Sequence, residues 1–235
     1  MLLLPSAMWA LFAGFAAADT ILHLEYAASL SQVPIGEVSV RVHLTEEAGD
    51  QPGRYEIAGS ARSIGLWETF QRWRAEYSAS GAIADGAPVP SSYRLLQSTP
   101  RKTRDVRVAN TQLHEIKNGR QREPRSPPPG LDVLAAFFVR PDCAATDAGM
   151  ALHTGRYPYR LTRRAWAESG IDDASAERAD DCLLSLLDVE DGDRYRLRLQ
   201  LVELAGWRVP RALVVRVPFA ARLVLRDWRV ETGSR

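Results

Sequence analysis

The stretch "EVSVRVHL" (Glu37–Leu44) alternates strictly between polar and apolar residues. Successive side chains of a β-strand point to opposite faces, so this pattern predicts a strand with one buried and one solvated face. Such strands are typical of antiparallel sheets, whose second face can stay in water. The expected buried face carries Val38, Val40, Val42 and Leu44.

The same alternation recurs along most of the chain. It is clearest over residues 21–30, 72–80 and 194–201, and further strands are expected near 54–63, 91–98, 102–109, 111–117, 156–164, 181–189, 211–219 and 222–231. Turn signals separate them at Pro34–Gly36, Asp50–Gly53, Asp85-Gly86, Asn118-Gly119 and Asp191-Gly192. About a dozen strands, each with one buried face, require a curved sheet that encloses a shared interior. The chain is therefore predicted to be mainly β, with one large curved antiparallel sheet rolled as an incomplete barrel.

The segment "PPPGLDVLAAFFV" (Pro127–Val139) breaks this pattern. Prolines cannot join a central ladder, so the chain must leave the sheet there. We expect a helix from about Asp132 to Val139, with Asp132 as its N-cap. It is apolar around nearly its whole circumference, so it should be buried inside the rolled sheet or across its mouth. A second short helical turn at Gly65–Trp73 is expected to plug another part of the same wall with Leu66, Trp67 and Phe70.

The amino-terminal residues indicate the compartment. Residues 1–18 are apolar and end in Ala16-Ala17-Ala18, which is typical of a signal peptide cleaved after Ala18. The expected product is a periplasmic protein, residues 19–235, that forms a single β-domain with no stable membrane span. An N-terminal membrane anchor is the alternative. The net charge of the 235 residues is only +1, so no global field favours nucleic acid.

The two cysteines, Cys143 and Cys182, form an even set in a chain expected to be exported. This favours one disulfide that ties the exit of the central helix to a strand. Two unrelated buried thiols are the alternative. Neither cysteine has a CxxC partner or a histidine at ligand spacing, so no metal site is predicted. His23 and His43 are expected to be solvated strand histidines, with a weak metal site as the other interpretation.

The motifs HExxH, G-x-S-x-G, the P-loop and G-x-G-x-x-G do not occur in the chain, so we expect a non-catalytic protein without a cofactor. A large rolled sheet can enclose more volume than its medium-sized side chains fill. We therefore expect a cleft for a lipid or other apolar small molecule. The alternatives are a structural or partner-binding envelope factor whose aromatic residues fill the core and, least favoured, an enzyme of unrecognised type. The residues expected to line the cleft are Tyr26, Val40, Trp73, Tyr77, Leu134, Phe137, Phe138, Tyr195 and Leu197.

Several pieces, in order, resemble the bacterial domain-of-unknown-function 3108 family of exported proteins. They are "YAASLSQVPIGEVSVRV" (Tyr26–Val42), "YEIAGSARSIGLWETFQRWRAEYSASG" (Tyr55–Gly81), "PPGLDVLAAFF" (Pro128–Phe138), Cys143, "GRYPYRL" (Gly155–Leu161), Cys182 and "ELAGW" (Glu203–Trp207). The resemblance implies a periplasmic β-fold rolled as an incomplete barrel, and Cys143 and Cys182 match a cysteine pair in some members. The family has no established activity, so the resemblance implies no catalytic residue.

Overall fold

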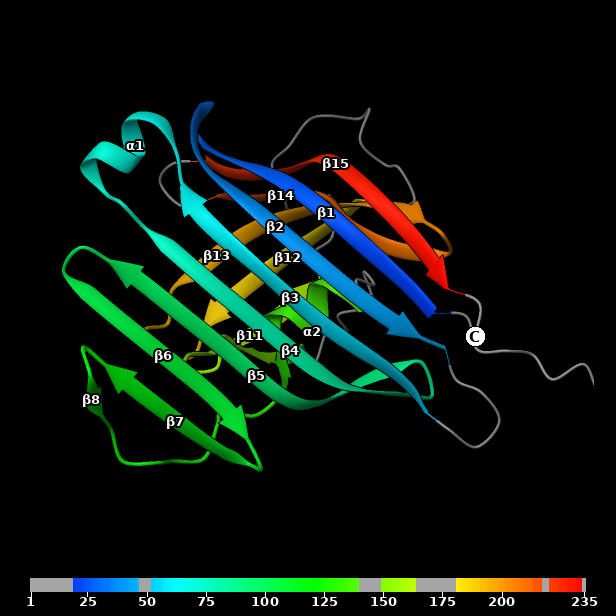
Figure 1. Ribbon diagram of the computed structural model, residues 1–235, viewed down its shortest axis with the longest axis horizontal. Coiled ribbons are helices and arrows are strands. Elements are labelled where there is room, and N and C mark those ends of the chain that lie inside the picture. Colours follow the sequence, from blue (N-terminus) through cyan, green and yellow to red (C-terminus); the bar gives the residue numbers. More distant parts are fainter. Residues whose placement is uncertain (1–18, 47–51, 140–148, 164–180, 217–219, 234–235) are drawn as a thin grey trace, which may run out of the picture.

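A computed structural model describes residues 19–46, 52–139, 149–163, 181–216 and 220–233 (Figure 1). These residues form one 15-stranded sheet and two short helices. The strands are β1 (Asp19–Leu30), β2 (Val33–Thr45), β3 (Gly53–Ser63), β4 (Arg74–Ala84), β5 (Ala87–Thr99), β6 (Lys102–Ala109), β7 (Gln112–Lys117), β8 (Arg120–Gln121), β9 (Leu131–Asp132), β10 (Met150–His153), β11 (Pro158–Arg163), β12 (Asp181–Asp188), β13 (Arg194–Leu204), β14 (Trp207–Arg216) and β15 (Ala220–Gly233). The helices are α1 (Gly65–Phe70) and α2 (Val133–Phe138).

The first and last strands meet in the middle of the sheet. The order is β8-β7-β6-β5-β4-β3-β2-β1-β15-β14-β13-β12-β11-β10-β9. Strands β1–β8 form one up-and-down meander and β10–β15 form another, and β9 adds to the outer edge of the second. All pairings are antiparallel except β9 with β10, which is parallel. The mainly β, antiparallel prediction is confirmed.

The sheet rolls up without closing into a barrel. Its two edge strands, β8 and β9, are not hydrogen-bonded to each other, and β9 instead lies beside β5. Strands β6–β8 continue the sheet beyond β5, and Figure 1 shows them at the lower left. The predicted incomplete barrel is confirmed.

Helix α2 lies inside the roll, as predicted. The Asp132 carboxylate accepts hydrogen bonds from the backbone N–H groups of Leu134 (3.0 Å) and Ala135 (2.9 Å), which fixes the start of the helix. Leu134, Ala135 and Phe138 pack into one core with β1–β5 and β14, whereas Ala136 packs into a second core around β10–β13. The helix thus fills the space between the two halves of the roll.

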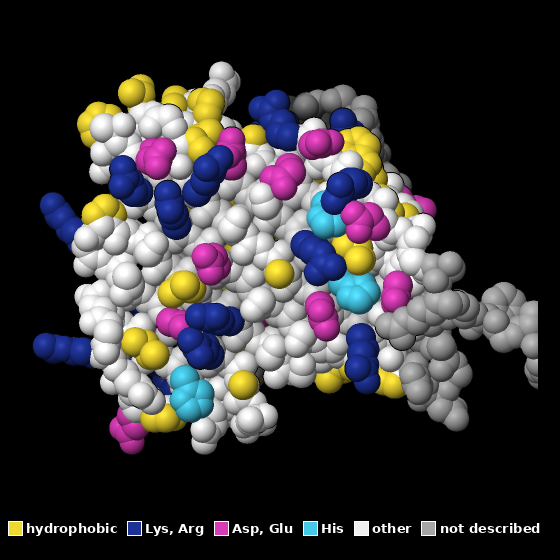
Figure 2. Space-filling view, in the orientation of Figure 1, with side chains coloured by type: hydrophobic (Ala, Val, Ile, Leu, Met, Phe, Trp, Pro, Cys, Tyr) yellow, Lys and Arg dark blue, Asp and Glu magenta, His cyan; other side chains and the backbone are white. Residues whose placement is uncertain are grey.

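Helix α1 does not plug the wall, and this part of the prediction is wrong. None of its residues is buried: Leu66 is 78%, Trp67 38% and Phe70 84% exposed. The helix connects β3 to β4 at the end of the sheet, where it lies beside β2 without being covered. Figures 1 and 2 show it at the upper left, where hydrophobic side chains gather on the surface.

No helix within the described ranges is both long and apolar enough to span a membrane. The predicted signal peptide, residues 1–18, and Cys143 lie outside the described residues.

Candidate functional site

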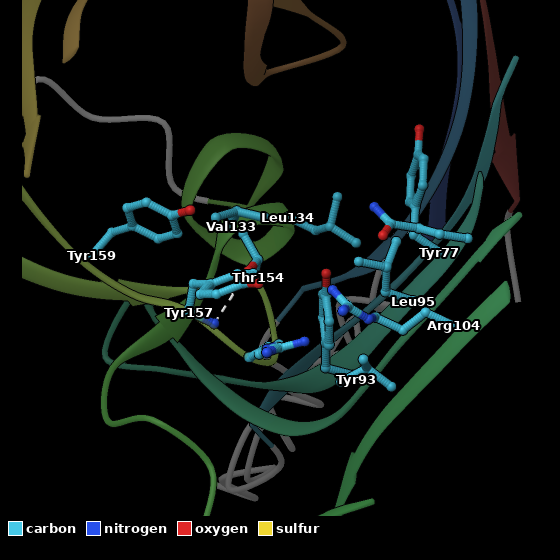
Figure 3. Close-up of a pocket in the computed structure, with 12 residues that line it drawn as sticks. Tyr77, Tyr93, Leu95, Arg104, Val133, Leu134, Thr154, Tyr157 and Tyr159 are labelled. Atoms are coloured by element: carbon cyan, nitrogen blue, oxygen red, sulfur yellow. Dashed lines mark hydrogen bonds between the residues drawn. The ribbon is translucent and has the colours of Figure 1, made fainter. Parts of the chain in front are cut away.

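A cavity of about 360 Å³ opens inside the roll (Figure 3). On one side is the wall formed by β4–β6, and on the other are the loop between β10 and β11 and the start of β11. The first turn of α2 borders the cavity. Its lining consists of Tyr77, Tyr93, Leu95, Gln97, Arg104, Val106, Val133, Leu134, Thr154, Arg156, Tyr157 and Tyr159. Figure 3 shows Tyr157 and Tyr159 on one side and Tyr77, Leu95 and Arg104 on the other.

Strand register sorts the β4–β6 wall into rows. Tyr77 pairs with Leu95, and Leu95 pairs with Val106, which gives an apolar row across three strands. The next row toward the end of the sheet contains Gln97 and Arg104, which also pair directly. Since side chains two residues apart share a face, both rows point into the cavity. The lining therefore changes from apolar to polar along the strands.

The opposite wall is a tight loop held against the first. The hydroxyl of Thr154 accepts a hydrogen bond from the backbone N–H of Tyr157 (3.4 Å), and the Arg156 guanidinium lies 4.8 Å from the centre of the Tyr157 ring. Gly155 has a φ of +78°, and a Cβ atom there would lie 2.6 Å from Cε1 of Tyr93. A glycine is required both by the backbone conformation and by this close approach.

A buried carboxylate joins the two walls. Glu115 of β7 is only 3% exposed, and its Oε1 atom lies 3.1 Å from Arg104 Nε and 3.1 Å from Arg156 Nη1. Arg122 Nε lies 3.9 Å from its other oxygen. We call Tyr93, Glu115, His153, Gly155 and Arg156 the seam, because contacts among them join the two halves of the roll where no ladder does.

The deeper part of the seam holds titratable groups in a desolvated setting. The His153 ring lies edge-on to Tyr93, with centroids 6.0 Å apart, and its Nδ1 atom accepts a hydrogen bond from the Gly155 N–H (3.0 Å). Burial lowers the pKa of His153, which favours the neutral imidazole. Burial also raises the pKa of Asp132, although the two helix N–H groups oppose this shift.

The residues predicted to line a cleft do not share one cavity. Tyr77 and Leu134 line the cavity described above. Tyr26, Val40 and Phe138 are buried in the first core, Leu197 is buried in the second, Tyr195 packs against the second and Phe137 against both. Trp73 borders a separate hollow beside α1, together with Trp67. Whether any of them contacts a ligand stays a prediction.

Sequence reasoning missed Arg104, Arg156, Tyr157 and Tyr159. One available signal was Arg104, which occupies an inward position on a strand face that otherwise carries Val106 and Val108. An arginine on such a face marks either a buried ion pair or a binding site.

The two strand histidines do not form a site together. The register opposes His23 to Arg41 and Ile21 to His43, and the histidines lie near different carboxylates, Glu231 (3.5 Å) and Asp19 (3.7 Å). Within the described ranges, no cluster of three or more His, Cys, Asp or Glu residues could hold a metal ion. Cys182 is 2% exposed and is not a free thiol; its pairing with Cys143 stays a prediction.

Comparison with known proteins identifies no family. No family profile matches the chain, and no curated protein matches it. A solved structure that it resembles is the crystal structure of a beta-barrel-like protein of domain of unknown function DUF1849 from Brucella abortus. The TM-score is 0.41 and the identity 9%, over 92% of this chain and 98% of that chain. This similarity is too low to transfer a function.

Proposed function

We propose that this chain is a non-catalytic protein of the cell envelope, exported to the periplasm, that holds a lipid or other apolar ligand in the cavity between β4–β6 and residues 154–159. The cavity itself is the observation that carries the proposal. It persists although the two cores beside it are packed, and its volume of about 360 Å³ falls within the range of roughly 300–1,000 Å³ typical of small-molecule sites.

The composition of the lining supports an apolar ligand. The row Tyr77, Leu95 and Val106 faces Val133 and Leu134 of α2 across the cavity. Covering such a surface with a ligand removes apolar area from water, at about 25 cal/mol per Å².

Part of the lining is fixed in place before any ligand arrives. The Tyr77 hydroxyl donates a hydrogen bond to the backbone carbonyl of Ser39 (3.0 Å), so the ring cannot simply swing in to fill the space. A preformed wall reduces the ordering cost of binding. Export to the envelope is supported by the apolar residues 1–18 and their A-x-A ending.

The direct test is native mass spectrometry of the protein purified from the envelope of its own host, where we expect a co-purifying apolar molecule. A neutral fluorescent probe, N-phenyl-1-naphthylamine, should bind the purified protein saturably with one site. Leu95→Trp places an indole in the apolar row and should abolish probe binding. Leu96→Trp, one residue along on the outer face of the same strand, is the matched control and should not. Absence of saturable binding to the wild-type protein contradicts the proposal.

Exposure of α1 favours a second candidate, an envelope factor that binds a protein partner. Leu66 and Phe70 are 78% and 84% exposed side by side on one short helix, and exposed apolar patches mark interaction sites. If this is the function, Leu66→Ser together with Phe70→Ser should abolish partner capture by crosslinking in the host envelope and leave probe binding unchanged.

A further inference from the structure

We infer that the ligand is an anionic amphiphile, whose single acidic head group binds Arg104 and Arg156 at the polar end of the cavity while its chain lies along the apolar row. This inference rests on the proposed function and specifies the chemical class of its ligand. Carboxylates and phosphate esters share the required chemistry, and the experiment below separates them.

Positive charge exceeds negative charge at this end of the cavity. Three guanidinium groups, those of Arg104, Arg122 and Arg156, surround the one carboxylate of Glu115. Lys117, paired with Arg104 in the ladder, points to the same face and is half-buried. One carboxylate neutralises one of these cations, so the site is complementary to a further anion.

The two arginines are placed for shared recognition. Arg104 comes from β6 and Arg156 from the opposite loop, and both line the cavity while touching the same Glu115 oxygen. Their side chains are only 11% and 22% exposed, so neither guanidinium group is fully hydrated. Charge-assisted hydrogen bonds from guanidinium groups to an oxyanion are strong in such a setting.

The other acids near the cavity have partners of their own. Asp188, which pairs with Tyr159, accepts hydrogen bonds from the backbone N–H groups of Glu190 and Asp191. Asp105, adjacent to Arg104, points to the outer face and is bonded to Arg94 and Arg107. Asp132 is fully buried behind the cavity, where the first turn of α2 holds its carboxylate. Among the described residues, Glu115 is the acid that contacts the two arginines.

Register also orders the ligand along the cavity. Gln97 and Arg104 form the row next to Leu95 and Val106, so polar and apolar lining are separated by two residues, about 7 Å along the strand. A head group bound at the polar row of Gln97 and Arg104 places the alkyl chain on the apolar row of Leu95 and Val106. A neutral ligand such as an alcohol would leave the cationic end without an anion.

The test compares dodecanoic acid, 1-dodecanol and dodecyl phosphate as displacers of N-phenyl-1-naphthylamine, each below its aggregation concentration. We expect the acid to bind roughly tenfold to a hundredfold more tightly than the alcohol. A stronger effect of the phosphate identifies a phosphate head group, and a stronger effect of the acid identifies a carboxylate. Inorganic phosphate alone should displace nothing, and displacement by it would overturn the amphiphile assignment.

Two variants that should change the relative affinity for acid and alcohol in opposite directions separate an effect on binding from an effect on folding. Arg156→Gln should reduce the ratio of the affinity for dodecanoic acid to that for 1-dodecanol toward one. Glu115→Gln removes the neutralising carboxylate and should increase this ratio. Arg160→Gln, an exposed arginine on β11, is the charge-matched control and should leave the ratio unchanged. Since both ligands are measured on the same variant, the ratio does not depend on the fraction of folded protein.

Two failures are distinguishable. Equal affinity for acid and alcohol overturns the anionic head group and leaves the apolar site intact. If neither displaces the probe because the probe itself does not bind, the proposed function fails as well.

Discussion

The hydroxyl of Tyr26 on β1 donates a hydrogen bond to the backbone carbonyl of Pro210 on β14, 2.9 Å away, although β15 lies between these strands in the sheet. The contact is possible because β14 and β15 separate here, at a branch in the sheet that we call the fork. Strand β15 pairs with β14 only between Ala212 and Arg216, and beyond that point it follows β1 alone. Tyr26 bridges the fork and also meets the ring of Phe138 edge-on, at 6.2 Å between centroids, which links the fork to α2.

Tyr26→Phe tests this bridge. The variant keeps the ring and its contact with Phe138 but leaves the Pro210 carbonyl without its donor, in a place where Tyr26 is 2% exposed. We expect a loss of about 1–3 kcal/mol in the free energy of unfolding, measured by urea denaturation. Tyr159→Phe, in the cavity wall, should cost less than half as much. Equal losses in the two variants would show that the fork hydrogen bond contributes nothing specific.

A second prediction concerns pH and Asp132. Its folded-state pKa is raised by burial above the unfolded value of about 3.9, so the folded protein holds this proton more tightly. The stability contribution of Asp132 is therefore largest in acid and falls as the pH rises through the interval between the two values. Asp132→Asn keeps an oxygen for the helix cap but cannot ionise. Relative to wild type, Asp132→Asn should gain stability as the pH rises from 3.5 to 7.

The comparison with wild type isolates this residue. His153, which opposes Asp132 in the β9–β10 ladder, titrates in both proteins, so its contribution cancels in the difference. Asp132→Ala removes the cap as well, so it should be about 1–2 kcal/mol less stable than Asp132→Asn at every pH. A stability difference between Asp132→Asn and wild type that does not change with pH contradicts the prediction.

Local patterns in the sequence were enough to predict the longer strands, their buried faces and the inner helix, but not the short strands β8, β9 and β10. Leu22, Leu24, Val40 and Val42 are buried as alternation requires, because burial on one face is what the period of two encodes. The first turn was misplaced: it lies at Ser31 and Gln32, which both have positive φ, while Pro34 sits inside β2 next to a register shift. A bulge lets a strand accept a proline, and composition alone does not reveal it.

The cavity could not be predicted in the same way. Its two walls meet through Glu115 and Arg156, which are 41 residues apart in the sequence, and no periodic pattern specifies which distant strands approach each other. The prediction also assumed one shared interior, so it combined Tyr26 and Leu197, which α2 separates into two cores. The exposure of Phe70 was missed for a related reason, since an apolar turn does not show whether a layer lies beneath it.

The Cys143–Cys182 disulfide is a third prediction. Non-reducing peptide mapping of protein from the oxidising compartment should recover the two cysteines in one linked pair. Reduction should lower the stability by about 2–5 kcal/mol, and the double variant Cys143→Ala/Cys182→Ala should lose a similar amount and no longer respond to reductant. Recovery of two alkylated free thiols from native material would exclude the bond.

The last prediction tests whether the seam holds the two halves of the roll together. Gly155 and Gly192 share the same backbone conformation, with φ of +78° and +77°, but an added Cβ meets Tyr93 at Gly155 and open space at Gly192. Gly192→Ala should therefore cost only the backbone strain, about 1–2 kcal/mol. Gly155→Ala should cost about 1–3 kcal/mol more, because the Tyr93 ring must move in a packed environment. Tyr93 lines the cavity, so Gly155→Ala should also weaken N-phenyl-1-naphthylamine binding, which Gly192→Ala should leave unchanged. Equal losses of stability in the two variants, with unchanged probe binding, would mean that the loop does not pack on Tyr93 in solution and that the roll is held by its ladders alone.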